Sequence, residues 1–329
     1  MRAILCTDYA PPEDLAFEDV DDPAPGPGQV VVDVRAAGLG FVDALYVQGL
    51  YQVKPPLPFI PGSEVAGVVT ALGDGVTNLA IGDEVFGMAQ AGAFAEKTLL
   101  GANNCVKKPA NLSFEAAAGF LVSYCTALFA FDNRGGITGP DETMLVLGAG
   151  GGVGLAAIDL AKAMGSYVIA CASSEEKRAA CLAQGADAVV DYTKDDWRKQ
   201  VEAAAANSPG GGVNAVYDPV GGDFSNIALR TLKPWGRFLV IGFADGEIPK
   251  IPLNLALLKQ CQIVGVDWGG WVRTNDPSGQ GALLEKLSEL VVSGKLNPPQ
   301  GQQYPLAEAG KAMRDLLDRK VTGKGVLVP

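Results

Sequence analysis

The chain has 329 residues, with 26 Lys and Arg against 37 Asp and Glu, so its formal net charge is −11. Because phosphate contacts require clustered cations and the sequence has no basic run, we expect neither a nucleic-acid partner nor a membrane-surface partner. No apolar stretch reaches the length of a bilayer span, and acidic residues follow the first strand too soon for a secretory signal. We therefore expect a cytoplasmic protein of two domains.

The sequence contains no histidine. This excludes Ser-His-Asp and Cys-His catalysis, histidine general bases and every histidine-ligated metal site. The six cysteines are scattered without a C-x-x-C pair, so the spacing of a zinc cluster is absent. We expect no bound metal, and we expect the cysteines to serve as small buried side chains.

The first 110 residues form short alternating segments divided by Pro and Gly, which is typical of strands. After a first strand within residues 1–7, the predicted strands cover residues 30–39, 64–72, 83–88 and 94–100. This pattern indicates an irregular antiparallel barrel or sandwich. A helix is predicted over residues 113–132, with Ser113 as its N-cap.

From residue 144 onward, buried strands alternate with helices. The predicted strands are residues 144–147, 167–172, 188–191, 215–218, 237–241 and 262–266, and the helices are 154–164, 175–184, 195–206 and 224–232. Six strands with intervening helices predict a doubly wound parallel sheet. Two amphipathic helices (282–293 and 306–318) and a short strand (326–328) follow. Sequence order leaves open whether this tail returns to the first domain.

A glycine-rich turn lies between the first strand and the first helix of this series. Its residues are Gly148, Gly151, Gly152, Val153 and Gly154, spaced as G-x-x-G-x-x-G instead of the strict G-x-G-x-x-G. Glycine lets the backbone approach a pyrophosphate, and the N–H groups and dipole of the following helix stabilise that charge. The turn therefore predicts a dinucleotide site.

The end of the second strand indicates which dinucleotide binds. NAD sites place Asp or Glu there to hold the ribose 2′-hydroxyl, whereas this chain has Ser173 and Ser174, followed by Lys177. Small hydroxyl residues and a cation suit a 2′-phosphate, so we expect NADP(H). Glu176 has capping-box spacing from Ser173 and is expected to fold back on the helix start. A solvated helix face is the alternative for Lys177.

Several motifs occur in order along nearly the whole chain. They are residues 36–43 (AAGLGFVD), 49–51 (GLY), 61–67 (PGSEVAG), 124–127 (YCTA), 217–222 (YDPVGG), 241–244 (IGFA) and 322–324 (TGK), together with the glycine turn. This set resembles the zinc-independent quinone oxidoreductase branch (zeta-crystallin-like) of the medium-chain dehydrogenase/reductase superfamily. The resemblance implies an α/β protein that forms a homodimer. It also implies a GroES-like catalytic domain over residues 1–122 and 268–329, and a Rossmann NADP-binding domain over residues 123–267.

The same resemblance implies residue roles at the cofactor. The matched positions are Ser173, Ser174, Lys177 and Tyr192 near the adenosine 2′-phosphate, Phe243 and Ala244 as backbone that flanks the nicotinamide, and Thr126 as a hydroxyl near it. Lys324, in the 322–324 motif, is expected to contact the cofactor. Thr126 is also expected in the catalytic set.

Two further residues of the matched motifs are expected at the reaction centre. Tyr51 aligns with the tyrosine that is thought to donate a proton in similar enoyl-thioester reductases. Packing against the substrate alone is the alternative for Tyr51. Asp43 is retained from the family pattern as a candidate catalytic residue, with a hydrogen-bonded structural role as its alternative.

The chain departs from its relatives at two positions. Zinc-dependent relatives have Cys where this chain has Gly40 and His where it has Ser63, so the catalytic zinc ligands are missing. Gly40 also replaces the Asn that is usual in quinone oxidoreductases, which removes a side-chain donor near the nicotinamide. Without metal or histidine, the site is expected to act by holding an activated acceptor against the nicotinamide in a dry cleft.

These features predict an NADPH-dependent reductase of quinones or of activated C=C bonds, such as those of enones and enals. Two alternatives remain. One is an enoyl-thioester (acyl-CoA) reductase, which the Tyr51 pattern favours. The other is an NADPH-binding structural or regulatory protein with little catalysis, which the missing Asn at Gly40 permits.

Overall fold

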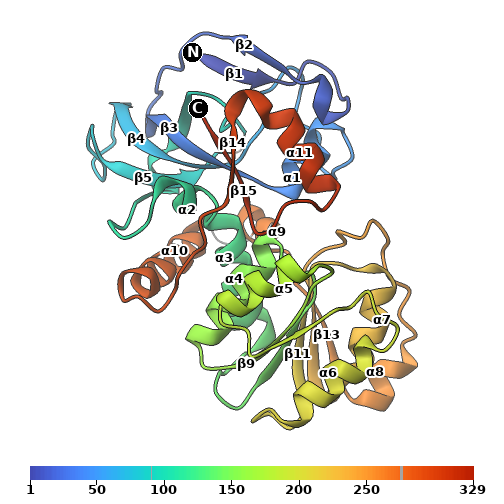
Figure 1. Cartoon of the computed structure of the whole chain (residues 1–329). Helices are drawn as coiled ribbons and strands as arrows, with labels where there is room; N and C mark the ends of the chain where they lie inside the picture. The colour runs from blue at the N-terminus through green and yellow to red at the C-terminus, as the bar shows by residue number, and fades with distance from the viewer. Residues whose placement is uncertain (90, 275–276) are drawn as a thin grey trace. The chain divides into compact units, whose positions relative to one another are not determined.

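The structure is a computed structural model of the chain, and it describes residues 1–89, 91–274 and 277–329. The chain divides into two compact units. The first unit joins Met1–Val122 with Pro298–Pro329, and the second is Ser123–Asn297 (Figure 1). Within the described ranges, no helix combines the length and the apolar character needed to cross a membrane.

The first unit is a strand-rich unit with short helices. Its strands are β1 (Arg2–Leu5), β2 (Ala16–Asp19), β3 (Gln29–Leu39), β4 (Glu64–Leu72), β5 (Glu84–Met88), β6 (Lys97–Gly101), β7 (Cys105–Lys107), β14 (Gln302–Pro305) and β15 (Gly325–Val328). Its helices are α1 (Phe41–Val47), α2 (Phe114–Ala118) and α11 (Ala309–Leu317), with 3-10 turns η1 (Pro12–Asp14), η2 (Ala102–Asn104) and η4 (Leu306–Glu308).

One seven-stranded sheet organises this unit, in the order β14-β15-β3-β4-β5-β7 with β6 also paired to β3. The C-terminal strand β15 runs antiparallel to β3, with Leu327 opposite Ala37. The tail of the chain therefore returns to the first domain, as the family resemblance implied. Val32, Val65 and Leu327 are buried in one apolar core that fixes the sheet's register, because a slip of one residue would expose them.

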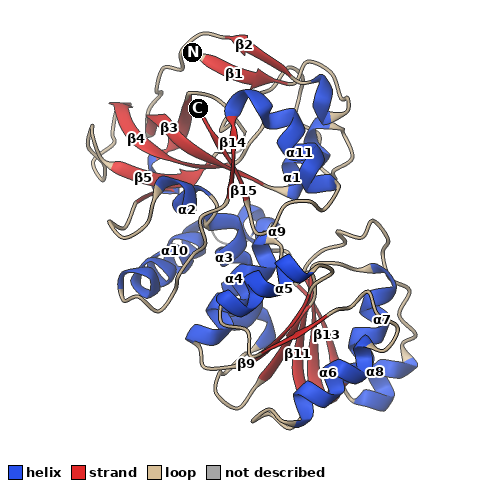
Figure 2. Ribbon diagram, in the orientation of Figure 1, coloured by secondary structure: helices blue, strands red, loops and turns tan. Residues whose placement is uncertain are grey.

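The second unit is a six-stranded sheet with helices on both faces (Figure 2). Its strands are β8 (Thr143–Val146), β9 (Tyr167–Cys171), β10 (Ala188–Val190), β11 (Val213–Asp218), β12 (Leu232–Val240) and β13 (Gln262–Gly265). Its helices are α3 (Leu121–Leu128), α4 (Gly152–Ala163), α5 (Glu175–Ala183), α6 (Trp197–Ala206), α7 (Gly222–Thr231), α8 (Asn254–Lys259), α9 (Trp268–Thr274) and α10 (Pro277–Val292), with the π-helix η3 (Phe129–Gly135).

The strand order is β10-β9-β8-β11-β12-β13, and every pairing is parallel. Each of the six predicted strands is present, and the doubly wound sheet is confirmed. The strands were recognisable because both faces of the sheet are covered, so strands such as β8 and β11 are buried at every position. The order reverses direction between β8 and β11, which creates the crevice where such folds bind ligands.

The prediction of one continuous helix over residues 113–132 is wrong. Ser113 is its N-cap as expected, because the Ser113 hydroxyl accepts a hydrogen bond from the Ala116 backbone N–H (3.1 Å). However, α2 ends at Ala118, and α3 begins only at Leu121. At Gly119 a Cβ would lie 3.0 Å from Cγ of Lys324, so the break occurs where the C-terminal segment packs against the helix end.

The structure also differs from the predicted domain division. Residues 268–297, which the resemblance assigned to the GroES-like domain, belong to the second unit. The Trp271 ring of α9 packs on Phe129 with 5.0 Å between ring centroids. The Asn297 backbone N–H donates to the Asp159 carboxylate of α4 (2.9 Å). These contacts keep the segment on the Rossmann unit up to Asn297.

Candidate functional site

In a parallel sheet, the carboxyl ends of all the strands lie at the same end of the sheet, along the edge that crosses the strands. In the second unit, this edge carries the glycine turn after β8, Ser173 and Ser174 after β9, Tyr192 after β10, and Phe243 and Ala244 after β12. The structure therefore brings the sequence-predicted cofactor residues of this unit to one sheet edge. Thr126 is half-buried on α3.

The glycine turn has a conformation that side chains would prevent. Gly148 has a φ of 54°, and a Cβ there would lie 2.8 Å from the Val220 side chain. A Cβ on Gly154 would lie 2.6 Å from the Ala149 Cα, so α4 and β8 pack without space for a side chain. The turn therefore brings the first helix turn close to the strand end, as a dinucleotide-binding turn requires.

The N-terminus of α4 suits an anion. The N-cap is Gly151, which has no side chain to cap the helix, and the first turn carries no acidic residue. The first N–H groups of a helix have no partner within the helix, and its dipole favours negative charge there. This twelve-residue helix can therefore hold a pyrophosphate, with the glycine turn allowing close approach.

The end of β9 places Lys177 beside the glycine turn. A Cβ on Gly150 would lie 2.5 Å from Cβ and 2.8 Å from Cγ of Lys177, so the stem of this lysine lies directly on the turn. The predicted capping box at Ser173 is wrong in its position. The N-cap is Ser174, whose backbone is extended and whose hydroxyl accepts from the Lys177 N–H (3.2 Å). Both serines are exposed.

Three contacts hold the end of β10 in place next to β9. Arg178 forms an ion pair with Asp191 (3.2 Å) and donates to the Ala172 carbonyl (3.2 Å), so its guanidinium joins the two strand ends. The half-buried Tyr192 ring meets Phe224 edge-on, with 4.7 Å between centroids. The stem of Lys177 therefore lies against the glycine turn, while Arg178 joins the ends of β9 and β10.

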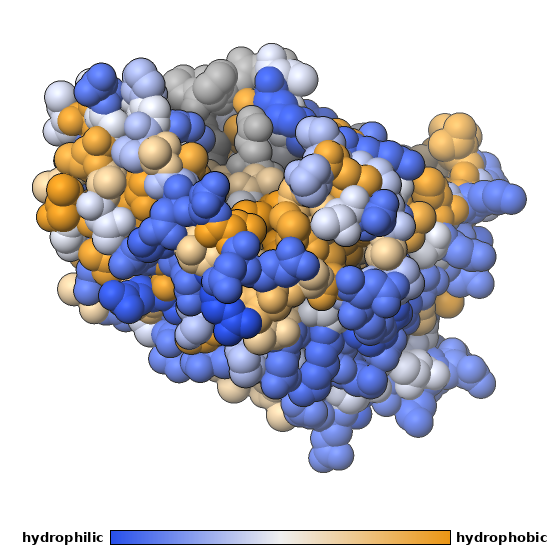
Figure 3. All heavy atoms as spheres, turned by 90° about the horizontal axis from the view of Figure 1, so that it is seen from above, coloured by the Kyte–Doolittle hydropathy of each residue, from blue (hydrophilic) through white to orange (hydrophobic). Residues whose placement is uncertain are grey.

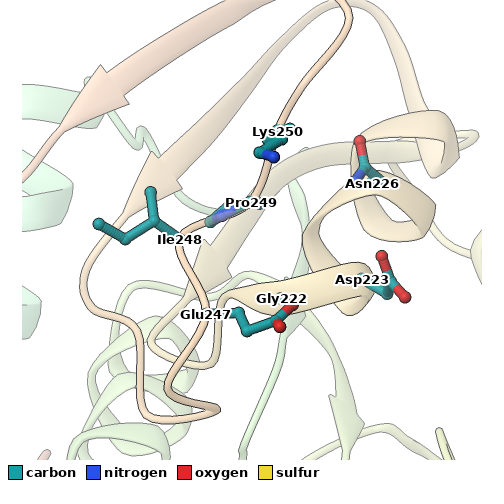
Figure 4. Close-up of a pocket in the computed structure, with 7 residues that line it drawn as sticks. All are labelled: Gly222, Asp223, Asn226, Glu247, Ile248, Pro249 and Lys250. Atoms are coloured by element: carbon teal, nitrogen blue, oxygen red, sulfur yellow. The ribbon is translucent and has the colours of Figure 1, made fainter.

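The residues predicted to flank a nicotinamide lie on the loop after β12. Phe243 is 40% exposed, and Ala244 is exposed. The Ala244 N–H donates to the Pro219 carbonyl (3.0 Å), which ties this loop to the one after β11. A hollow of about 410 Å³ lies beyond these loops, between the start of α7 and residues 247–250, and Asp223, Asn226 and Lys250 are among its lining residues (Figure 4).

In the first unit, Asp43 is buried at the start of α1. Its carboxylate accepts a hydrogen bond from the Gly40 backbone N–H (2.7 Å), and Asp43 is 2% exposed. Burial raises the pKa of this carboxyl to about 7, against the lowering effects of the Gly40 hydrogen bond and of Lys324. Asp43 therefore titrates close to neutral pH.

Lys324 has an acidic partner within its own unit. Its ammonium is ion-paired with the Glu64 carboxylate, and the Lys324 side chain is only 10% exposed. The other Glu64 oxygen accepts from the Val122 N–H (2.7 Å). Lys324 thus balances a buried acid of the same unit, a partner that sequence reasoning missed because the two residues are 260 positions apart.

Tyr51 lies just beyond α1. Gly49, with a φ of 65°, turns the chain sharply after the helix. The half-buried Tyr51 ring then meets the Tyr46 ring edge-on, with 5.0 Å between centroids and an angle of 82° between planes. The Tyr46 ring therefore orients Tyr51 within the first unit.

Sequence reasoning also missed Asp218, which ends β11 with its side chain buried. The signal that could have identified it is an ionisable residue that closes a buried strand and precedes Pro-x-Gly-Gly. Because polar groups are costly to bury without partners, an acid at that position implies local backbone donors.

The raised pKa of Asp43 makes protein stability dependent on pH. In the unfolded chain Asp43 ionises near its usual pKa of about 3.9, so between that pH and the folded value of about 7 the folded state binds more protons. The free energy of unfolding therefore falls as pH rises through this window, by about 4 kcal/mol in total for this group. Asp43→Asn, which keeps an acceptor for the Gly40 N–H, should remove that loss.

Urea unfolding of the wild type and Asp43→Asn at pH 5 and at pH 8 measures this effect. The stability gain of the variant should be larger at pH 8. Asp21→Asn, which changes an exposed carboxylate of the same unit, is the control. Its free energy of unfolding should differ from that of wild type by the same amount at both pH values. An equal difference at the two pH values would show that Asp43 is ionised normally in the folded protein.

Comparison with known proteins agrees with this architecture. Residues 26–126 match the family described as the alcohol dehydrogenase GroES-like domain, and residues 152–285 match the family described as zinc-binding dehydrogenase. Quinone oxidoreductase-like protein 2 from Bos taurus is 37% identical over 99% of this chain and 92% of its own length.

Two bacterial proteins are similar over almost their whole length. The quinone oxidoreductase of Pseudomonas aeruginosa is 34% identical over 98% of this chain and 97% of that protein. The structure of Escherichia coli quinone oxidoreductase complexed with NADPH superposes with a TM-score of 0.88 at 28% identity and covers 100% of both chains. The chain therefore belongs to the quinone oxidoreductase branch of the medium-chain dehydrogenase/reductase family, and it is an oxidoreductase.

Proposed function

We propose that this protein is an NADPH-dependent oxidoreductase that reduces quinones or activated C=C bonds without a metal ion. The observation that carries the proposal is the edge of the second sheet, where an uncapped helix N-terminus, a glycine turn and the Lys177 stem lie together. The Escherichia coli relative, solved with NADPH, supports the choice of cofactor.

The residues of this edge fit the cofactor part by part. The glycine turn from Gly148 to Gly154 would hold the pyrophosphate. Ser173, Ser174, Lys177 and Tyr192 would bind the 2′-phosphate, and the backbone of Phe243 and Ala244 would orient the nicotinamide, with the Thr126 hydroxyl nearby. When bound, NADPH supplies the hydride that reduces the acceptor. The protein contributes alignment and the exclusion of water.

Metal independence is part of the proposal. The sequence has no histidine, and Gly40 and Ser63 stand where zinc-dependent relatives have ligands. Gly38 pairs with Glu64 in the β3–β4 ladder, so Gly40 and Ser63 flank the same end of this strand pair. Across the described ranges, no three His, Cys, Asp or Glu side chains are grouped so that they could hold a metal ion.

The acceptor class follows from what the site lacks. Reduction of a simple ketone leaves an alkoxide, which needs a metal ion or a strong acid. Quinones, enones and enoyl thioesters delocalise the developing charge within the acceptor itself. A second candidate, enoyl-thioester reduction, is favoured by Tyr51, whose phenol could supply the proton that an enolate carbon requires.

The direct experiment measures NADPH oxidation with a quinone, an enone and an enoyl-CoA, before and after dialysis against a strong chelator. Turnover with quinones or enones that survives chelation supports the proposal. Turnover confined to enoyl-CoA selects the second candidate. NADPH binding without turnover on any acceptor points to a structural or regulatory role. Activity that chelation removes and zinc restores would overturn metal independence.

We also propose a homodimer formed through the β13 edge of the second unit. β13 ends the strand order, so one side of it lacks a neighbouring strand. Large apolar side chains are exposed on β13, on α8 and its N-cap residue, and on β12: Trp235, Leu253, Leu257, Leu258 and Ile263. Monomers rarely expose such a patch at an unpaired edge. Figure 3 shows one face of the molecule, on which apolar and hydrophilic side chains are interspersed. Analytical ultracentrifugation should show a dimer for the wild-type protein and a monomer for the Leu257→Asp variant.

Lys177→Ala tests the preference for NADPH. A charge-assisted hydrogen bond to the 2′-phosphate contributes about 1.5–3 kcal/mol, so NADPH binding should weaken roughly 10–150-fold. NADH binding should change little, because NADH has no 2′-phosphate. The dissociation constants of both cofactors are measured by fluorescence titration. Lys199→Ala, on the exposed face of α6, is the matched control. Equal losses for NADPH and NADH would contradict this placement of Lys177.

Tyr51→Phe distinguishes the acceptor classes. Reduction of an enone or enoyl thioester requires a proton on carbon, and a positioned phenol contributes about 10²–10⁴-fold. A reduced quinone carries its charge on oxygen, where water protonates it readily. The variant should therefore lose far more kcat with C=C acceptors than with quinones. Tyr46→Phe keeps the paired rings and is the control. Small, similar losses on both acceptors would assign Tyr51 to packing.

A further inference from the structure

Asp218 organises the loop that follows β11. One of its carboxylate oxygens accepts hydrogen bonds from the backbone N–H groups of Val220 (2.8 Å) and Gly221 (3.0 Å). The other oxygen accepts from the Ser225 hydroxyl at the first turns of α7. Asp218 is 2% exposed, and its burial raises the pKa of the carboxyl against the lowering effect of these three donors. The carboxylate thus fixes residues 218–222, which we call the Asp218 loop.

The Asp218 loop touches the glycine turn on one side. A Cβ on Gly148 would lie 2.8 Å from Cγ2 of Val220, so the Val220 side chain packs directly on the first glycine of the turn. The Leu147 N–H donates to the Tyr217 carbonyl (3.0 Å) immediately before the loop. A displacement of Val220 would therefore be transmitted to the turn that is proposed to hold the pyrophosphate.

The same loop touches residues 241–247 on its other side. A Cβ on Gly221 would lie 3.0 Å from Cδ1 and 3.2 Å from Cα of Phe243, which is contact with both the ring and the backbone. Gly221 has a φ of 79°, so its conformation also favours glycine. The position of Phe243 is therefore set by the path of the Asp218 loop.

A ladder of backbone hydrogen bonds joins the two loops. Ala244 N–H donates to the Pro219 carbonyl (3.0 Å), and Asp245 N–H donates to the Val220 carbonyl (2.8 Å). Gly222 N–H donates in the opposite direction, to the Glu247 carbonyl (3.0 Å), and these two residues lie side by side in Figure 4. Each bond depends on the loop shape that the Asp218 carboxylate imposes.

We propose that Asp218 is a positioning residue that holds the pyrophosphate turn and the nicotinamide-flanking backbone in register, so that the cofactor ring is presented correctly for reduction of the acceptor. The inference rests on the proposed function. The glycine turn and Phe243 come from separate strand ends, and the Asp218 loop contacts both of them. An error of about 1 Å in such alignment can reduce turnover about 100-fold while binding changes far less.

The test compares Asp218→Ala with Asp218→Asn. Alanine removes the acceptor for all three donors. Asparagine keeps one oxygen for the two backbone N–H groups, and its amide can donate to the Ser225 hydroxyl, which rotates to accept. Three quantities are measured for each variant: the NADPH dissociation constant, kcat with the best acceptor, and amide hydrogen exchange of residues 241–247 in the cofactor-free protein. Asp223→Asn, an exposed carboxylate on the same helix start, is the control.

Asp218→Ala should lower kcat about 100-fold, with an NADPH dissociation constant within about fivefold of wild type. Exchange at residues 241–247 should accelerate about tenfold or more without cofactor, because buried hydrogen bonds are lost. Asp218→Asn should restore both quantities to within about fivefold. An alanine variant with wild-type turnover and exchange overturns the proposal. Parallel losses of binding and kcat that asparagine does not rescue also overturn it.

A folding failure of the alanine variant leaves the test intact, because Ser225→Ala removes only the hydroxyl donor. This variant should lower kcat several-fold and accelerate exchange at residues 241–247 while NADPH binding stays close to wild type. An unchanged Ser225→Ala protein would overturn the inference. Failure of the proposed function is recognised separately, because the wild-type protein would then not bind NADPH, or none of the acceptors would support NADPH oxidation.

Discussion

Parallel pairing of the six central strands is the constraint on which the rest of the second unit depends. Because each connection must cross a face of the sheet, every strand begins at one edge and ends at the other. Residues that are 26 to 95 positions away from Gly148, from Ser174 to Phe243, are thereby placed along one edge. A few loops at this end of the sheet supply the groups that bind a charged cofactor. Buried strands such as β8 and β11 support these loops.

The first unit treats buried charge in a different way. Glu64 is buried at the start of β4, and Lys324 neutralises it from the other end of the chain. Asp43 has the Gly40 N–H as its hydrogen-bond donor and titrates near neutral pH. The ion pair between Glu64 and Lys324 also ties the C-terminal segment to β4, which gives the tail a polar anchor in addition to its apolar core.

The sequence was sufficient for the second unit's sheet and much of its edge, because these depend on local patterns. Buried strands are continuous apolar runs, and the glycine turn is a contiguous motif, so both can be read from neighbours in sequence. Features that involve distant partners could not be predicted in this way. Lys324 pairs with Glu64 across most of the chain, and α2 ends at the Lys324 stem near Gly119, where a continuous helix was predicted. The N-cap is Ser174 instead of the predicted Ser173. Two adjacent serines carry the same hydroxyl group, so the sequence alone could not distinguish them. The backbone conformation decides which serine caps the helix.

The hydrogen bonds at Asp159 bring the two ends of the second unit together. The Tyr124 hydroxyl donates to Asp159 (2.6 Å), and the Asn297 N–H donates to the same carboxylate oxygen (2.9 Å). Tyr124 lies at the entrance of the second unit and Asn297 at its exit, so the two ends of this unit are neighbours. Domains whose two ends lie close together tolerate insertion into another domain. The Rossmann unit is an inserted domain within the GroES-like unit. Val122 and Pro298 of the first unit flank this insertion.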